Sequence, residues 1–135
     1  MSIKVWHIDD RAIADLHGPS NMPKAFLDVK TGFRNDGSQA AAFAELFSQG
    51  HCKLVAEVGS SDPEQAWHLT NHVDRQWQDN PGVRAVPGPH RSSCVGDALE
   101  MPDGSWLLCA SFGWTPIADP RPPRAPSSPS KPPKP

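Results

Sequence analysis

Two histidines and a histidine–cysteine pair are the residues of this chain whose types and spacing could bind a metal. His68 and His72 stand four positions apart, which would place both imidazoles on one side of a helix, and His90 and Cys94 repeat the spacing. Zinc prefers such nitrogen and sulfur ligands and takes four of them in a structural site. Leu69 occupies the glutamate position of the HExxH pattern. The alternative is a set of solvated side chains on a polar helix face; we favour it and expect no metal and no cofactor.

Cys94 and His90 could also serve as a thiolate nucleophile and its base. The sequence offers neither a third group to orient the histidine nor a recognisable oxyanion loop, so we favour a structural cysteine. We therefore expect no catalytic residues and no enzyme activity.

Asp97 presents a different question, because strict strand alternation turns its carboxylate to the same side as Val95 and Leu99. A bulge at Gly96 could rotate the side chain outward or let it accept backbone amides. A functional acid is the alternative. We favour the structural role, since a single carboxylate without a partner is seldom catalytic.

Two polar surfaces are candidates for binding. The first combines arginines and tryptophans of the kind that hold single-stranded nucleic acid, namely Arg75, Trp77, Arg84 and Arg91 with Trp6 and Trp114. Core tryptophans and ordinary ion pairs are the favoured alternative for these residues. The second is a patch beside the expected hairpin, and as a binding surface it would comprise His72, Arg75, Arg91, Ser92, Ser93 and Asp97.

Hydrophobic periodicity and capping signals predict three helices that would position these residues. They run from Asp9 or Asp10 to Leu16, from Ser38 to Gln49, and from Asp62 to Asn80-Pro81-Gly82, which ends the third helix. The expected buried stripes are Ala12, Ile13 and Leu16; Ala40, Phe43, Ala44 and Phe47; and Ala66, Leu69, Val73 and Trp77. Asp62, Pro63 and Gln65 fit the N-cap, first-turn and capping-box positions.

Alternating residues predict strands over 3–8, 26–30 and 53–58, followed by a β-hairpin. The hairpin joins residues 92–97 to 106–114 through a Met101-Pro102-Asp103-Gly104 turn. Its return strand would bury Trp106, Leu108, Ala110 and Phe112. We therefore expect a single small two-layer α+β domain over residues 1–117, with a mixed or antiparallel sheet.

The last residues differ in composition from the rest. Nine of the sixteen prolines lie at or after Pro116, and four of the thirteen Lys/Arg residues lie within 119–135. Such a segment buries too little apolar surface to fold, so we predict a disordered Pro-rich basic tail over 118–135. The remaining chain is mildly acidic, which argues against indiscriminate binding of nucleic acid.

Three cysteines cannot pair completely, no CxxC occurs, and the N-terminus lacks a secretory pattern. The apolar runs are also too short to cross a bilayer. These features predict a cytoplasmic protein without a membrane partner.

Residues 53–117 contain a set of short motifs, namely 69-LTNHVDRQW-77, Asn80-Pro81, 91-RSSCVGD-97, Gly104 and 112-FGW-114. Together these motifs resemble the YodL-like family of small proteins from phages, plasmids and other mobile elements. Cys94 stands where that family would have serine or threonine. The resemblance implies an accessory protein with no defined activity. We therefore expect a protein that binds a host or element protein, in nucleic-acid metabolism or defence evasion, with direct nucleic-acid binding as the alternative and a small metal-dependent enzyme as a third.

Overall fold

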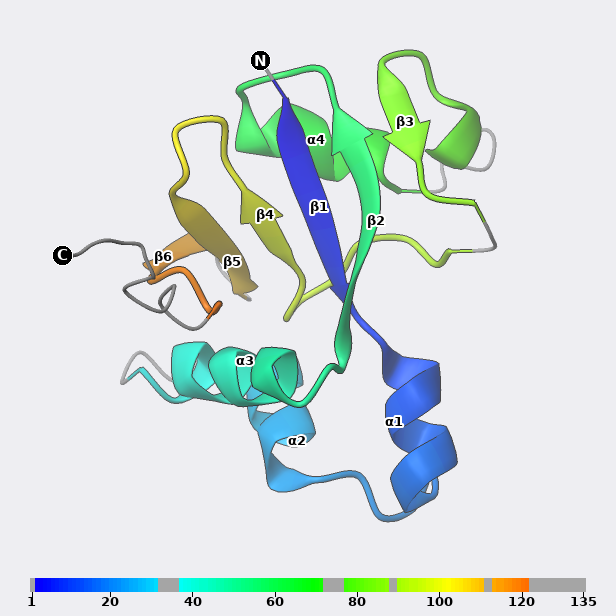
Figure 1. The fold of residues 1–135 in the computed structure, drawn as a ribbon, viewed down its shortest axis with the longest axis vertical. Coiled ribbons are helices and arrows are strands. Elements are labelled where there is room, and N and C mark those ends of the chain that lie inside the picture. The colour runs from blue at the N-terminus through cyan, green and yellow to red at the C-terminus, as the bar shows by residue number, and fades with distance from the viewer. Residues whose placement is uncertain (1, 32–36, 72–76, 88–89, 111–112, 122–135) are drawn as a thin grey trace, which may run out of the picture.

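The computed structural model describes residues 2–31, 37–71, 77–87, 90–110 and 113–121. These residues contain both helices and strands (Figure 1), and the α+β class expected from the sequence is confirmed. In chain order the elements are β1 (Ile3–Ile8), α1 (Asp10–His17), α2 (Lys24–Thr31), α3 (Ser38–Ser48), β2 (Cys52–Val58), α4 (Pro63–Leu69), the 3-10 turn η1 (Trp77–Asp79), β3 (Val83–Ala85), β4 (Ala98–Glu100), β5 (Trp106–Ala110) and β6 (Gly113–Ile117).

The described strands form one six-stranded sheet in the order β3-β2-β1-β4-β5-β6, and every neighbouring pair is antiparallel. Strand β1 therefore lies in the middle, between β2 and β4, although it begins the chain. Its register with β2 shifts after Val5, because Val5 pairs with Ala56 and Trp6 pairs with Leu54. Val55 is the extra residue of this bulge, and it is buried together with Ala56, where strict alternation predicted that the two would face opposite sides.

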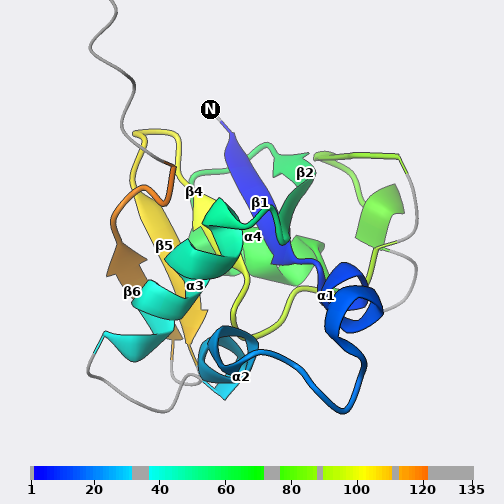
Figure 2. The same ribbon diagram turned by 60° about the horizontal axis from the view of Figure 1, so that its bottom comes forward.

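Apolar side chains cover both faces of the sheet. One cluster packs β1, β4 and β5 against α1, α2 and α3, with Ile8, Phe43 and Leu108 among its buried members. The other packs Val5 and Leu99 against Ala66 of α4 and Trp77 of η1. Figure 2 shows α2 and α3 in front of the sheet and α4 behind it. Helices distant in sequence thus pack against the two faces of the sheet around β1.

The predicted strand over residues 26–30 is wrong, because this segment belongs to α2. Ala25 and Val29 are buried one helical turn apart, and Lys24 donates to Asp28 across the same spacing at 2.6 Å. A run of five residues is too short for its periodicity to separate the two structures.

The predicted helices exist, but their buried faces are partly different. Ile13 of α1 is buried, whereas Ala12 is exposed and Leu16 is 67% exposed. In α3 the face that meets the core consists of Gln39, Ala42, Phe43 and Leu46, and Ala44 is exposed. The periodicity of an alanine-rich segment therefore predicts that a helix forms more reliably than it predicts which face of that helix is buried.

Helix α4 is shorter than expected, since it ends at Leu69 and Trp77 lies in a separate 3-10 turn. Asp62 caps it as predicted, by accepting from the Glu64 amide. Gln65 does not complete a capping box; its side chain instead accepts from Ser60. Val73, expected to be buried on this helix, lies outside the described residues.

The Met101–Gly104 turn joins β4 to β5 as predicted. Residues 92–97 are not a strand, however, and the return arm is divided between β5 and β6. Trp106 and Leu108 are buried, Ala110 is half-buried, and Phe112 lies outside the described residues. Beyond Arg121 the predicted tail also lies outside them. No described helix has the length and apolar character needed to span a membrane.

Candidate functional site: a buried polar cluster beside the central strand

Polar side chains from three parts of the chain meet where β1 ends. His7 comes from β1 and Thr70 from the end of α4, while Arg91, Ser93 and Asp97 come from the segment before β4. We call these five residues the polar cluster. His7, Thr70, Ser93 and Asp97 are all 5% exposed or less, and Arg91 is half-buried. Buried polar groups are costly unless they are hydrogen-bonded, so the partners of each decide what the cluster can do.

Asp97 accepts hydrogen bonds through both carboxylate oxygens. Its Oδ1 receives the backbone amide of Ile8 at 2.9 Å, and its Oδ2 receives the amide of Cys94 at 2.7 Å. The guanidinium of Arg91 approaches both oxygens, at 2.9 Å and 2.7 Å. This bidentate arrangement is among the strongest that side chains form. The carboxylate therefore ties the segment before β4 to the end of β1.

The remaining donors of Arg91 are also occupied. Its Nη2 donates to the carbonyl of Ile8 at 2.9 Å, and its Nη1 donates to the carbonyl of Ser92 at 2.9 Å. The Nε atom lies 3.2 Å from the carboxylate of Asp10. All three guanidinium nitrogens of Arg91 thus have partners within the protein. The planar group thereby connects the end of β1 with the segment before β4.

A tight turn delivers Asp97 to this position. The amide of Asp97 donates to the carbonyl of Cys94, and Gly96 adopts a φ of +95° that side chains rarely tolerate. The Gly96 amide donates to Cys109, whose own amide donates to the Asp97 carbonyl. Gly96 and Asp97, the two residues just before β4, therefore oppose one residue of β5, as in a β-bulge with glycine at its first position. The predicted bulge and the predicted acceptance of backbone amides by Asp97 are both present.

Hydroxyl groups connect His7 to the end of α4. The Nε2 atom of His7 lies 2.9 Å from Ser93 Oγ, which lies 2.7 Å from Thr70 Oγ1. Thr70 in turn donates to the carbonyl of Ala66 at 2.8 Å. Because Nε2 also faces the Asp97 carboxylate at 3.7 Å, we place the ring proton on Nε2. The donors then run in one direction, from His7 through Ser93 and Thr70 to the helix.

This arrangement contains serine, histidine and aspartate, but it differs from a catalytic triad. In a triad the serine donates to one ring nitrogen and the carboxylate holds the other. Here Ser93 and Asp97 both face Nε2 of His7, and the buried Nδ1 has no hydrogen-bond partner among the residues that the structure describes. The Ser93 proton points to Thr70, away from the ring that would have to remove it. The geometry therefore supports the fold and does not activate a nucleophile.

The ionisation of the cluster follows from its burial and its ion pair. Burial lowers the pKa of His7 from 6.5 to about 4, with Asp97 opposing the shift, so the ring is neutral at neutral pH. Burial is the largest single influence and would raise the pKa of Asp97. The hydrogen bond from Arg91 and the electrostatic influence of His7, Arg91 and Lys30 together outweigh it and hold that pKa below its ordinary value. At neutral pH the cluster thus contains one carboxylate paired with one guanidinium.

Three further residues surround this ion pair on the side of α1 and α2. Lys30 Nζ lies 3.2 Å from Asp10 Oδ1 and donates to Cys94 Sγ at 3.2 Å. Burial raises the pKa of the Cys94 thiol, with Asp97 adding to the shift and Lys30 opposing it. The thiol is therefore protonated at neutral pH, and it lies beside an ammonium group.

The four metal candidates are not assembled by the described residues. His68 is exposed on α4, and His90 stacks on Trp77 with ring centroids 5.7 Å apart. Cys94 lies against Lys30, and His72 lies outside the described residues. Within the ranges that the structure describes, no group of three or more His, Cys, Asp or Glu residues is placed to hold a metal ion.

The expected arginine–tryptophan surface is not formed by those of its members that can be placed. Trp77 is completely buried and donates to the carbonyl of Arg91. Arg91 is bound by Asp97, and Arg84 pairs with Glu57 at 2.7 Å. Trp6 and Trp114 are half-buried, and Trp114 lies edge-on to Trp67. Arg75 lies outside the described residues.

The patch predicted beside the hairpin is only partly a surface. Ser93 and Asp97 are buried, Arg91 and Ser92 are half-buried, and His72 and Arg75 lie outside the described residues. The sequence correctly predicted that Arg91, Ser93 and Asp97 lie close together. It predicted a binding surface, however, whereas Ser93 and Asp97 are buried and Arg91 is half-buried. The reason is that their partners, the end of β1 and the end of α4, are distant in sequence.

Sequence reasoning missed His7 and Thr70 as members of the cluster. The alternation of β1 put His7 on the side of Ile3 and Val5, and a histidine on an apolar strand face requires a partner. That signal was sufficient to single out His7. No comparable signal marks Thr70, whose role depends on where α4 ends. The resemblance of residues 53–117 to the YodL-like family stays a prediction, because comparisons of the chain with protein-family models, curated proteins and solved structures found no match.

Proposed function

We propose that this protein is a non-enzymatic accessory protein of a phage or other mobile element, and that it acts by binding a host or element protein. The observation that carries the non-enzymatic part is the closure of the polar cluster upon itself. His7, Ser93 and Asp97 are the residues best suited to chemistry, yet each is nearly inaccessible and bonded within the protein. A reacting group must be within reach of its substrate. The mobile-element part rests on the resemblance of residues 53–117 alone.

Binding to a protein is supported by apolar side chains at the end of the molecule formed by α1 and α2. Leu16 is 67% exposed and Leu27 is 53% exposed. Figure 1 places both helices at the end opposite to β3 and the N-terminus. Large exposed apolar residues are enriched where proteins meet, although scattered ones are common. A role in nucleic-acid metabolism or defence evasion would follow from the identity of the partner.

Direct nucleic-acid binding gains no support from the described residues, since Trp77 is buried and Arg91 is engaged by Asp97. It would show itself as affinity that falls steeply with added salt. The metal-dependent alternative likewise gains none, and elemental analysis of protein purified without a histidine tag would test it.

The decisive experiment identifies the partner by crosslinking in the native host and then measures binding to the purified partner by calorimetry. Changing both Leu16→Ser and Leu27→Ser should weaken binding at least about a hundredfold, since each leucine buried at the interface contributes roughly 1.5–3 kcal/mol. Val86→Ser is the matched control, because Val86 is also exposed but directly follows β3, which Figure 1 places away from α1 and α2. Equal affinity of all variants would remove these leucines from the interface. Turnover of a substrate that one polar substitution abolishes would contradict the proposal itself.

A further inference from the structure

An amine and a thiol from distant parts of the chain lie in contact on the outer side of the polar cluster. Lys30 of α2 places its Nζ atom 3.2 Å from Sγ of Cys94, a residue 64 positions away. The Lys30 side chain is 19% exposed, and Cys94 is half-buried. The ammonium also lies 3.2 Å from a carboxylate oxygen of Asp10 and over the ring of Phe26. The proposed function uses neither the amine nor the thiol.

The two groups are held together by the backbone around them. Cys94 is fixed by its amide hydrogen bond to Asp97. The turn that follows packs directly on α2, so a Cβ atom at Gly96 would lie 3.0 Å from the carbonyl oxygen of Val29. Gln39 donates to that same carbonyl and to the carbonyl of Cys109, which joins α2 to β5. Reacting atoms held about 3–3.5 Å apart in this way need little further ordering before a bond can form.

We propose that Lys30 and Cys94 are an oxidative modification site, at which a peroxide converts the pair into a sulfur–nitrogen bridge. Peroxide first transfers one oxygen to Sγ, so that the thiol becomes a sulfenic acid and one water is released. The ammonium of Lys30 then gives a proton to the Asp10 carboxylate. Its free electron pair attacks sulfur, the sulfur–oxygen bond breaks, and the oxygen leaves as a second water with a proton from nitrogen. Sulfur is oxidised by two electrons, and a thiol reductant reverses the reaction.

Cys94 is distinguished from the other two cysteines by its neighbour. All three are free thiols, and burial raises the pKa of Cys52 and of Cys109 to about 12. Cys94 is the thiol to which an ammonium donates directly. Its own pKa is raised by burial as well, so the reaction with peroxide should be faster at mildly alkaline pH, where more thiolate is present.

The test treats the full chain with hydrogen peroxide at mildly alkaline pH and maps the products by tryptic digestion and mass spectrometry. Because a disulfide would also remove two hydrogens, the background carries Cys52→Ser and Cys109→Ala. The expected product joins the peptides that contain residues 30 and 94, is about 2 Da lighter than their sum, and disappears on reduction with a thiol. Trypsin should fail to cleave after Lys30 in this product.

Two conservative variants keep the test sharp. Lys30→Arg preserves the positive charge, but a guanidinium stays protonated and does not attack sulfur, so the linked product should be lost. Cys94→Ser preserves the side-chain size and removes the sulfur. Oxidation should raise the thermal unfolding midpoint of the background protein, because the bridge would join α2 to the Asp97 segment, and it should leave that of Lys30→Arg unchanged. Absence of the 30–94 linkage, or its formation in Lys30→Arg, would overturn the proposal.

Discussion

Two arginine–carboxylate pairs in this protein have the same N–O distance and lie in different surroundings. Arg91 and Asp97 approach to 2.7 Å, with the Asp97 side chain 3% exposed. Arg84 and Glu57 also approach to 2.7 Å, on neighbouring strands, with side chains 81% and 31% exposed. Distance therefore says little about what each pair contributes. The two pairs differ in whether water could solvate the remaining charged group if its partner were removed.

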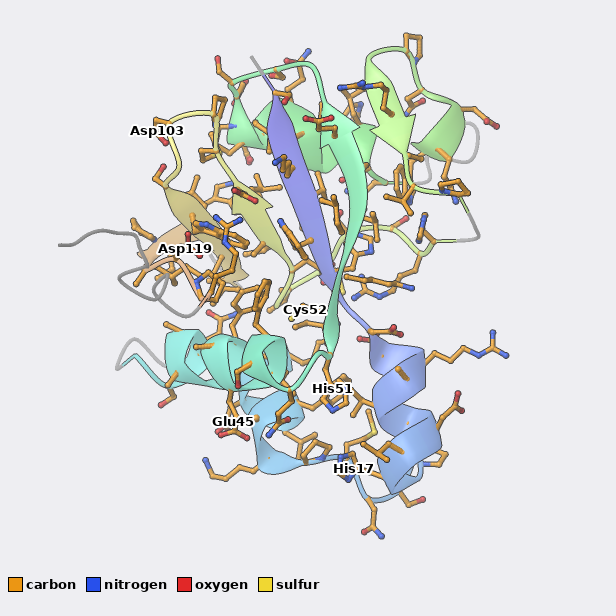
Figure 3. The ribbon with its side chains drawn as sticks, viewed as in Figure 1. His17, Glu45, His51, Cys52, Asp103 and Asp119 are labelled. Atoms are coloured by element: carbon orange, nitrogen blue, oxygen red, sulfur yellow. The ribbon has the colours of Figure 1, made fainter. Side chains whose placement is uncertain are left out.

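The surroundings of the two pairs make the contrast concrete. Asp97 also receives two backbone amides, so its removal would leave several buried donors without an acceptor. Glu57 of β2 accepts a hydrogen bond from the Ser2 hydroxyl. It also lines a groove of about 800 Å³ to which Asp103 of the β4–β5 turn contributes. Figure 3 shows Asp103 at that rim, projecting away from the sheet. Water can solvate whatever is left unpaired there, which makes such pairs weak.

The largest effect is expected from Asp97→Asn. The amide would place a donor against Arg91, and breaking a buried ion pair from one side costs about 3–5 kcal/mol. Chemical denaturation followed by circular dichroism measures the loss of unfolding free energy. Asp103→Asn, in the exposed turn, is the control and should cost less than about 1 kcal/mol. Comparable losses in the two variants would show that a buried carboxylate contributes no more to stability here than an exposed one.

A pH dependence of stability should arise from His7. Its pKa falls from 6.5 in the unfolded chain to about 4 in the folded protein, so the folded state binds fewer protons. This contribution is complete above pH 6.5 and is lost as the pH falls toward 4, and it amounts to roughly 3 kcal/mol. Denaturation curves at a series of pH values measure it. His7→Gln should flatten the dependence over this range, and an unchanged slope would show that His7 is not its source.

Gly96→Ala tests the turn that brings Asp97 to Arg91. Alanine at a φ of +95° would be strained, and its Cβ would crowd the carbonyl oxygen of Val29 at 3.0 Å. We expect a loss of about 2–3 kcal/mol. Gly104→Ala is the matched control, since φ is +89° there and nothing lies within 4 Å of the added atom. It should cost only about 1 kcal/mol. If the two losses were equal, the close approach to α2 would contribute nothing.

The smallest effect is expected from Arg84→Ala. This removes the exposed partner of Glu57, and such pairs contribute about 0.2–1 kcal/mol. The loss should shrink further at high salt, where exposed charges are screened. A loss of several kcal/mol in denaturation experiments would mean that the rim of the sheet resembles the polar cluster after all.

The sequence predicted the elements with strong local signals and misread those without them. β1, α3 and the Met101–Gly104 turn are where the pattern placed them. Residues 26–30 were misassigned because a short apolar run fits a helix as well as a strand. Leu16 was expected in the core because periodicity shows that a helix has an apolar face, whereas the neighbouring elements decide what covers that face.

The candidate site shows the same division. The residues from Arg91 to Asp97 were singled out from the sequence, and the internal role favoured for Asp97 agrees with its hydrogen bonds. Their burial could not be derived, because it depends on β1, whose last residue supplies an amide and a carbonyl to Asp97 and Arg91. Contacts across more than 80 positions leave no trace in local periodicity.

The sequence by itself determined the α+β class and the Met101–Gly104 turn, and it gave the acceptance of backbone amides by Asp97 as one outcome of a bulge at Gly96, since these follow from alternation and turn residues. Only the tertiary structure decided which amides these are and that Arg91 pairs with the carboxylate. The antiparallel sheet places β1 in the middle and brings its last residue, Ile8, to Arg91. Ser93 and Asp97, which were predicted to belong to a binding surface, are therefore buried beside it.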